Sequence, residues 1–297
     1  MKKFIIITDS CSDLPIEYIN ENKIPFVSLI LSYDGKEYKD DFGQSLDYRT
    51  FYEDLKNGAL PSTSQPNADS FSKVFKKYLE EYEEILYIGV SSGLSGTTNS
   101  ANIAKQNIYE ELKQDRIYIV DSLTASLGLG LLVKKSIDMQ KQGKSLSEIK
   151  EYIEEEKFKL NTYLTVDDLK FLKNGGRISS TAAYIGIVLH IKPLLTLNKE
   201  GKILACLKVK GRKKTINKLV EIVKEKIINS EEQTIAICHG ESLKDALKLK
   251  EALLKEVNVR EVLINEIGPV VGTHGGPGAL GVFFFGKERQ CHRIEHE

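Results

Sequence analysis

Cysteines are few in this chain, and none forms a close pair. The four cysteines lie at positions 11, 206, 238 and 291, without a CxxC spacing. Zinc ribbons and dithiol redox motifs are built on such pairs, so the sequence argues against both. Reduced thiols in a cytoplasmic protein are expected instead. The tail that holds Cys291, His292 and His296 is interpreted as a solvated terminus and not as a metal site.

The chain also lacks an excess of charge and a long apolar run. It has 42 Lys and Arg against 42 Asp and Glu, which gives a net charge of zero. Nucleic-acid-binding proteins normally carry a basic field, so we expect no nucleic-acid partner and interpret the basic run at 208–214 as a solvated face. No apolar run approaches the length that spans a bilayer. Apolar residues 4–7 are too few for a secretory signal, and a cytoplasmic location is therefore expected.

Common catalytic motifs are absent as well. The sequence contains no GxSxG, no Walker A lysine and no HExxH. The aspartates at 9, 13, 121, 167 and 168 could serve as acids or metal ligands, but three of them have the positions of helix-cap or strand-end residues. We therefore expect a protein that is not an enzyme and that holds neither a metal nor a cofactor.

The chain has the length of an α/β protein and the alternation of strands and helices that is typical of one. Its 297 residues exceed the usual size of a single core, which favours two domains. In the first half, buried strands end in polar residues and are followed by helices, which indicates a parallel sheet with crossover helices. After about residue 160, hairpin signals mix with helices and indicate a mixed sheet. We expect an N-terminal α/β domain at 1–160 and a C-terminal α/β domain at 161–297.

Local patterns predict several elements. Residues 26–33 are predicted to form one strand. Asp13 has the position of a helix N-cap, with Pro15 in the first turn of the helix that follows. Apolar residues at helical spacing from Phe71 to Tyr82 predict a helix after Thr-Ser-Gln-Pro at 63–66.

Small polar residues gather where these predicted strands end and helices begin. The pairs or triplets at 8–10, 91–92 and 121–122 follow strands, and strand ends of an open α/β sheet converge on one ligand crevice. Ser95, Gly96 and Thr97 precede one helix, and Thr63 and Ser64 precede another. Hydroxyls and free N–H groups at helix starts can hold a carboxylate or a phosphate. Simple N-capping is the alternative explanation for each segment.

A glycine-rich segment at 267–281 carries six of the 22 glycines, with His274 at its centre between Thr273 and Gly275. Glycine allows the backbone to approach a ligand closely. We expect a loop that brings His274 to the same anion site as the hydroxyl segments. A Gly/Pro loop with an incidental histidine is the alternative.

Seven motifs in this order resemble the DegV family of bacterial fatty-acid-binding proteins over nearly the whole length. They lie at residues 8–15, 63–66, 91–97, 120–122, 172–179, 191–193 and 268–281. The resemblance implies two α/β domains with one long-chain fatty acid between them. It implies a carboxylate held by Thr63, Ser95 and His274. It further implies that Arg177 is an exposed residue that docks fatty acid kinase, which transfers phosphate from ATP to the carboxylate. Asn67 departs slightly from the family, and it can still cap a helix.

Apolar candidates for the tunnel that holds the acyl chain lie in two segments of the second half. They are Ile185, Ile187, Val188, Leu189, Phe283, Phe284 and Phe285, although simple packing in the second core is the better explanation for most of them individually. The rival function is a phosphate-handling enzyme that uses the Ser, Thr and Gly segments. A DNA-binding regulator is disfavoured by the zero net charge. A transient contact with a membrane stays open.

Overall fold

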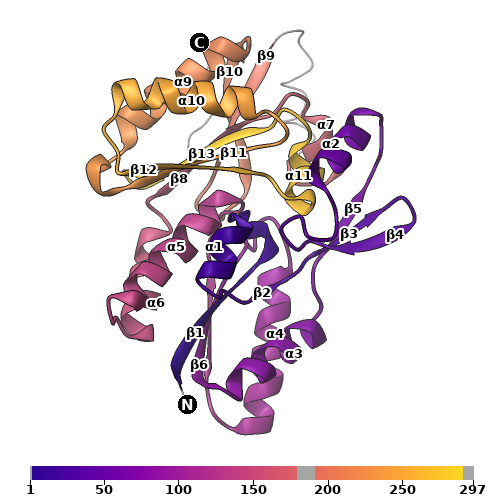
Figure 1. The fold of residues 1–297 in the computed structure, drawn as a ribbon, viewed down its shortest axis with the longest axis vertical. Coiled ribbons are helices and arrows are strands. Elements are labelled where there is room, and N and C mark those ends of the chain that lie inside the picture. The colour runs from indigo at the N-terminus through magenta and orange to yellow at the C-terminus, as the bar shows by residue number, and fades with distance from the viewer. Residues whose placement is uncertain (1, 179–190, 290–297) are drawn as a thin grey trace.

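A computed structural model describes residues 2–178 and 191–289 of the chain. Figure 1 shows two sheets stacked along the long axis, with helices between and around them. The expected architecture, a parallel N-terminal sheet and a mixed C-terminal sheet, is confirmed. Among the described residues, no helix has the combination of length and apolar character that crossing a membrane requires.

The N-terminal sheet has four parallel strands in the order β2-β1-β6-β7. Its strands are β1 (Lys2–Asp9), β2 (Phe26–Val27), β6 (Tyr82–Gly89) and β7 (Ile117–Asp121). Its helices are α1 (Ile16–Glu21), α3 (Ala68–Leu79), α4 (Thr97–Leu112), α5 (Leu127–Lys141) and α6 (Leu146–Glu156). Successive side chains of a strand point to opposite faces. Ile6 accordingly packs in the cluster with α5, whereas Ile5 and Ile7 pack in the cluster with α3 and α4.

A small antiparallel sheet in the order β4-β3-β5 extends from this half (Figure 1). It consists of β3 (Ile30–Tyr33), β4 (Lys36–Lys39) and β5 (Ser62–Ser64), and α2 (Tyr48–Lys56) lies beside it. The prediction of one strand over 26–33 is therefore wrong. Pairing of β2 with β1 ends at Val27, and the Leu29 amide donates to Ser10 Oγ at 3.1 Å, so the chain leaves one sheet before it joins the other.

The C-terminal sheet has six strands in the order β10-β9-β8-β13-β11-β12. They are β8 (Leu160–Thr165), β9 (Ile191–Leu197), β10 (Ile203–Lys210), β11 (Thr234–His239), β12 (Glu261–Glu266) and β13 (Leu280–Phe285). Helices α9 (Arg212–Lys226) and α10 (Leu243–Glu256) cover the outer face, and α7 (Lys170–Asn174) and α11 (Pro269–Gly275) lie at one end (Figure 1). The domain boundary at residue 160 stays a prediction.

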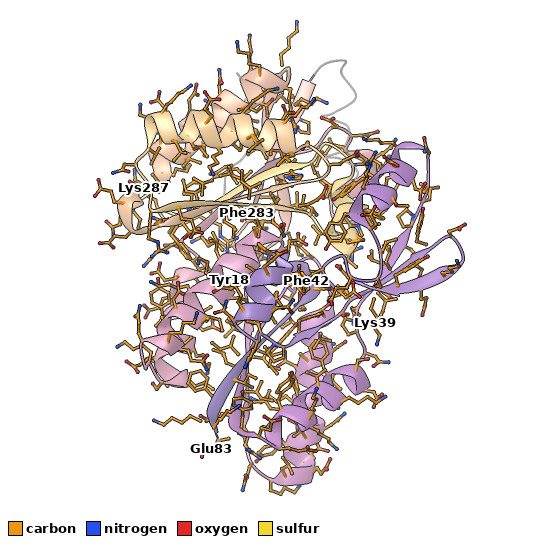
Figure 2. The ribbon with its side chains drawn as sticks, in the orientation of Figure 1. Tyr18, Lys39, Phe42, Glu83, Phe283 and Lys287 are labelled. Atoms are coloured by element: carbon orange, nitrogen blue, oxygen red, sulfur yellow. The ribbon has the colours of Figure 1, made fainter. Side chains whose placement is uncertain are left out.

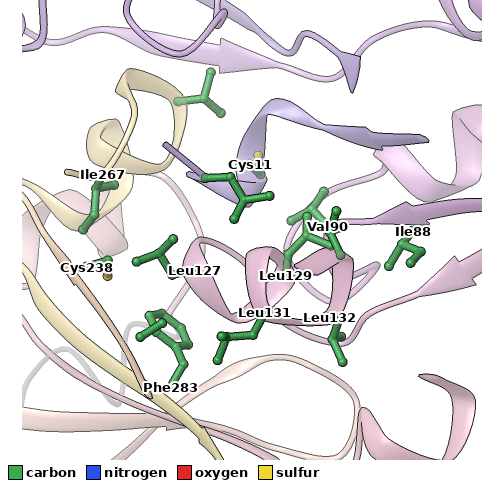
Figure 3. Close-up of a cluster of buried hydrophobic side chains, with 14 of the residues drawn as sticks. Cys11, Ile88, Val90, Leu127, Leu129, Leu131, Leu132, Cys238, Ile267 and Phe283 are labelled. Carbon is green, nitrogen blue, oxygen red and sulfur yellow. The ribbon is translucent and has the colours of Figure 1, made fainter. Parts of the chain in front are cut away.

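Helix α5 lies between the two sheets. Figure 3 shows Leu127, Leu129, Leu131 and Leu132 of this helix, with Val90 of the N-terminal half and Phe283 of β13 close by. All of these side chains are buried. A helix that is apolar on nearly every side belongs in a core, so α5 joins the two halves through shared apolar packing.

Two local predictions are corrected by the structure. Asp13 is not the N-cap of α1, because Pro15 occupies that position. Asp13 is instead buried in a left-handed conformation with φ of 47° at the end of a 3-10 turn. The glycine-rich segment is not a loop throughout, because residues after Gly268 form the seven-residue helix α11 with a proline at its first position. The capping role of Asn67 is confirmed, since its side chain accepts from the Ser70 amide at 2.9 Å.

Candidate functional site

A cavity of about 400 Å³ lies between the two sheets. Figure 2 places Phe283, one of its lining residues, in the middle of the molecule between the N-terminal elements and the six-stranded sheet. Its volume falls in the range of small-molecule sites, roughly 300–1,000 Å³. The lining is mostly apolar. Its polar members are Thr63, Ser64, Gln65, Ser95, Arg177 and His274, here called the polar end, and Ser126 and Thr162, of which Ser126 bonds to Asp13 and Thr162 pairs with Phe283.

The polar end is centred on a contact between Thr63 and His274. Thr63 Oγ1 lies 2.9 Å from His274 Nε2. Thr63 is fixed because β5 pairs with β3, opposite Leu31. His274 is fixed near the end of α11, which packs against α7, α2, β3 and β5. The fold thus brings together two residues that the sequence predicted to share one site.

The other ring nitrogen of His274 is a buried atom with no hydrogen-bond partner in the described structure. It faces the α-carbon of Gly175, where a side chain would collide with the imidazole. Burial, followed by the nearby positive charge of Arg177, lowers the pKa of His274 to about 4. The imidazole is therefore neutral near pH 7, and its Nδ1 is buried against the backbone of Gly175.

Arg177 lines the same cavity. It is half-buried, and its guanidinium donates to the carbonyl oxygens of Leu94, at 3.0 Å, and Gly175. The expected exposed arginine is therefore only half-exposed, because the turn after α7 directs this side chain toward the polar end. Burial lowers its pKa from the ordinary value, but the group remains a cation. Its kinase-docking role stays a prediction.

Ser95 also lines the polar end, and Thr97 fixes the position of its hydroxyl. Its hydroxyl lies 2.8 Å from Thr97 Oγ1 and accepts from the Thr97 amide at 3.3 Å. Gly96 and Thr97 are not lining residues, whereas Ser64 and Gly275 are. Gly96 packs against the Gln65 amide with no room for a side chain. Gln65 lines the cavity and donates to Ser100 Oγ at 3.0 Å, a role that its position in the Thr-Ser-Gln-Pro motif alone did not indicate.

The polar residues at the strand ends do not line the crevice as predicted. Asp9 accepts from the Val90 amide at 2.8 Å and from the Tyr87 hydroxyl at 2.7 Å. Asp121 accepts from the Ser92 amide at 3.1 Å. These carboxylates hold the loops after the parallel strands in place, because buried backbone amides need acceptors. The loops then present Cys11, Val90, Leu94 and Ser95 to the cavity.

The apolar part of the lining comes from both halves. It includes Leu29, Val90, Leu164, Leu197, Ile203, Cys238, Val270, Leu280 and Phe283. Of the predicted tunnel residues, Phe283 is confirmed as a lining residue. Phe284 is not, because β13 points it to the opposite face against Tyr163 and the outer helices. Phe285 lines a separate, smaller pocket. Ile185, Ile187, Val188 and Leu189 lie outside the described residues.

The geometry suits a ligand with a small polar head and a long apolar tail. Hydroxyl, imidazole and guanidinium groups gather at one end, and a chamber of aliphatic and aromatic side chains extends from it. Among residues 2–178 and 191–289, no cluster of three His, Cys, Asp or Glu side chains is arranged to hold a metal ion.

Comparison with known proteins identifies the family. Residues 3–287 match the family model described as "Uncharacterised protein, DegV family". The chain belongs to the DegV family. A DegV domain-containing protein of Clostridium perfringens is 44% identical over 290 residues, which cover 98% of this chain and 100% of that protein. The resemblance that the seven motifs indicated is thereby confirmed.

Solved structures of the DegV family share the whole fold. One from Thermus thermophilus, described as showing fatty acid binding of a DegV family protein, has a TM-score of 0.86 and 30% identity over 96% of this chain and 99% of that one. DegV from Bacillus subtilis, described as a fatty acid binding protein, has a TM-score of 0.83 and 31% identity over 97% and 100% of the two chains.

Proposed function

We propose that this DegV family protein binds one long-chain fatty acid, with the carboxylate at Thr63, Ser95 and His274. The observation that carries this proposal is the Thr63–His274 contact at the polar end of a mostly apolar cavity. A fatty acid has the same division into a polar head and an apolar tail. The descriptions of the Thermus thermophilus and Bacillus subtilis proteins support the same ligand class.

The energetics of the two parts agree with this ligand. An acyl chain of roughly 16 carbons, at about 0.8 kcal/mol per buried CH₂, supplies on the order of 10 kcal/mol before the costs of ordering. The carboxylate needs donors, because an unpaired buried charge is costly. Thr63, Ser95 and Arg177 line the cavity with hydroxyl and guanidinium groups, and the imidazole Nε2 of His274 lies at the Thr63 hydroxyl.

A phosphate-handling enzyme is the less favoured function. The Thr63 hydroxyl beside His274 has the spacing of a nucleophile and its base. Such a base needs a third group that orients it, and His274 Nδ1 has no such partner in the described part of the chain. The chamber next to the dyad is apolar, which suits a hydrocarbon and not a polar phosphate ester.

The experiment that tests binding is native mass spectrometry of the purified protein, followed by solvent extraction and identification of the released molecule. We expect one long-chain fatty acid per chain, and stripped protein should take up palmitate or oleate. Recovery of a phosphate ester, together with failure to bind either fatty acid, would refute the proposal.

We further propose that the bound carboxylate is presented to fatty acid kinase for phosphorylation and that Arg177 contributes to docking. This step rests on the resemblance and on the half-buried position of Arg177 among the residues that line the cavity. Because Arg177 also lines the cavity, Arg177→Glu must be assayed with protein fully loaded with palmitate. Acyl phosphate formation with kinase and ATP should drop sharply, since a reversed charge at an interface is costly. An unchanged rate at equal occupancy would remove Arg177 from the docking surface.

A further inference from the structure

Two buried carboxyl groups of the N-terminal half meet at the start of α11. Asp13 Oδ1 accepts from the Gly268 amide at 3.0 Å, and Asp13 Oδ2 accepts from the Ser126 hydroxyl at 2.5 Å. Asp40 lies at the same place, and its Oδ2 is a buried atom without a hydrogen-bond partner among the described residues. Both aspartates are 3% exposed or less. Asp13 therefore satisfies a backbone amide, and Asp40 contacts the chain, at the N-terminal end of a helix that belongs to the other half of the molecule.

Side chains of the N-terminal half pack closely around Gly268 and leave its backbone little room to move. A Cβ on Gly268 would lie 3.0 Å from Asp13 Oδ1, 3.1 Å from the Tyr48 hydroxyl and 3.3 Å from Asp40 Oδ1. The preceding carbonyl, of Ile267, accepts from the Tyr52 hydroxyl at 2.9 Å. These groups contact the backbone on several sides where α11 begins. Helix α11 itself lies beside α2 (Figure 1).

His274 lies on the same short helix, six residues beyond Gly268. At 1.5 Å of rise per residue, the two positions are about 9 Å apart along the axis. A helix of this length moves as one piece, so a shift at Gly268 displaces the imidazole from Thr63. We propose that Asp13 and Asp40 are positioning residues that hold α11, and with it His274, through their contacts at Gly268. This inference rests on the proposed function, because it assigns how the head-group site is held.

The charges around the pair favour protonation of the two carboxyl groups. No ion pair joins either carboxyl to a Lys, Arg or His among the described residues. Burial raises the pKa of Asp13 to about 7, and burial together with the charge of Asp13 raises that of Asp40 well above its ordinary value. The titratable groups that face the pair from the elements around it are Asp9, Cys11, Asp41, Tyr48, Tyr52, Cys238 and Glu266. None of them adds a positive charge, so ionising both aspartates would place two unpaired charges side by side.

Three variants separate this role from a general effect on folding. Asp40→Asn keeps the volume of the side chain and stays neutral at every pH. It should therefore hold α11 in place even at high pH, where the ionised carboxyl groups of the wild type no longer do so. Asp13→Ala removes the acceptor of the Gly268 amide and should loosen α11 at every pH. Asp9→Asn is the comparison variant, because Asp9 is an equally buried carboxyl with a raised pKa that bonds to Tyr87, Val90 and Cys11 and not to α11. Its charge also raises the pKa of Asp13, so this variant should shift the pH dependence without abolishing it.

The first measurement needs no ligand. Hydrogen exchange of the peptide that covers residues 266–276, corrected for the intrinsic rate, is followed between about pH 6 and about pH 8.5. Exchange should accelerate with pH in the wild type and in Asp9→Asn, and it should stay slow in Asp40→Asn. Equal pH dependence of the wild type and Asp40→Asn would overturn the proposal, and so would an unchanged rate in Asp13→Ala. A failure of fatty acid binding leaves this measurement intact.

The second measurement reports the head-group site. Palmitate affinity should fall with pH in the wild type and stay nearly constant in Asp40→Asn, and Asp13→Ala should lose about tenfold, the equivalent of one hydrogen bond to a charged group. Hexadecanol, which has the tail without the carboxylate, should be affected much less. Equal losses for both ligands in Asp13→Ala would indicate a collapse of the whole cavity and would contradict a role in positioning His274.

Discussion

Thr63 Oγ1 lies 2.9 Å from His274 Nε2, although the two residues are 211 positions apart in the chain. One comes from an edge strand of the small antiparallel sheet and the other from a helix next to the six-stranded sheet. The contact joins the two halves at the polar end of the cavity, and it can be tested as a unit.

A double-mutant cycle tests the pair. Thr63→Val and His274→Gln should each weaken palmitate binding by about tenfold or more, because a hydrogen bond to a charged group contributes about 1.5–3 kcal/mol. The double variant should lose less than the sum of the two, since the residues act together. Isothermal titration calorimetry measures the affinities. Thr215→Val, which removes the hydroxyl bonded to Gly211 on the outer helix α9, serves as the control and should bind normally. Additive losses would show that the two residues do not act on one carboxylate.

The proximity of Arg177 predicts a change in the titration of His274. Replacing Arg177 with Ala removes a positive charge, so the pKa of His274 should rise from about 4. It should remain below the ordinary value, because burial is the larger cause. NMR titration of the imidazole signals checks this in protein stripped of fatty acid. His239 is the internal control, since burial alone lowers its pKa and its signal should not respond to the substitution.

Phe283 and Phe284 are neighbours in β13 that face opposite sides of the sheet, which offers a matched pair for testing the chamber. Phe283→Ala and Phe284→Ala should each destabilise the protein by about 3–5 kcal/mol, the usual cost of a buried Phe→Ala change. Only Phe283→Ala enlarges the cavity, so only this variant should shift the preference toward longer acyl chains. Competition among fatty acids of graded length, with urea unfolding of both variants, measures the two effects. The same shift in Phe284→Ala would place the tail elsewhere.

The buried carboxyls predict a stability that falls as pH rises. Burial raises the pKa of Asp9 to about 6 and that of Asp13 to about 7, from an unfolded value of 3.8. A group whose pKa is raised by folding stabilises the native state below the unfolded pKa, and this contribution is lost as pH increases through the folded value. Free energies of unfolding in urea should therefore be lower at pH 8 than at pH 5. Asp9→Asn should reduce this difference, and an unchanged difference would mean that Asp9 is ionised throughout.

Much of the fold followed from local patterns in the sequence. The periodicity that begins at Phe71 predicted α3, and Asn67 caps it as expected. The helix ends at Leu79, however, and Tyr82, the last residue of the predicted periodicity, begins β6. Helix α6 begins with a capping box at Ser145 and Glu148, a local signal that was not used to predict it. The strand β8 was missed because Asn161, Thr162 and Thr165 are polar although they are buried, so the sequence shows neither an apolar run nor an alternation.

The site was harder to predict than the fold, for a physical reason. The residue types of Thr63, Ser95 and His274 marked them as candidates, and all three line one cavity. The positions of Arg177 and Asp13 depend on contacts with segments far along the chain, Leu94 and Gly268, which no local pattern encodes. An arginine in a turn, such as Arg177, or an aspartate before a helix, such as Asp13, is solvated in many proteins. Tertiary packing decides that both are at least partly buried here.

Helix α5 has a consequence for how the protein can be divided. Its leucines contact apolar side chains of both halves, so neither half covers its own apolar surface when the other is removed. A fragment that ends near residue 160 would expose the face of α5 that meets β13, and a fragment that begins there would expose the inner face of the six-stranded sheet. Exposed patches of that kind drive aggregation. The two halves should therefore be insoluble when expressed apart, recover only when produced together, and melt in a single transition in the intact chain.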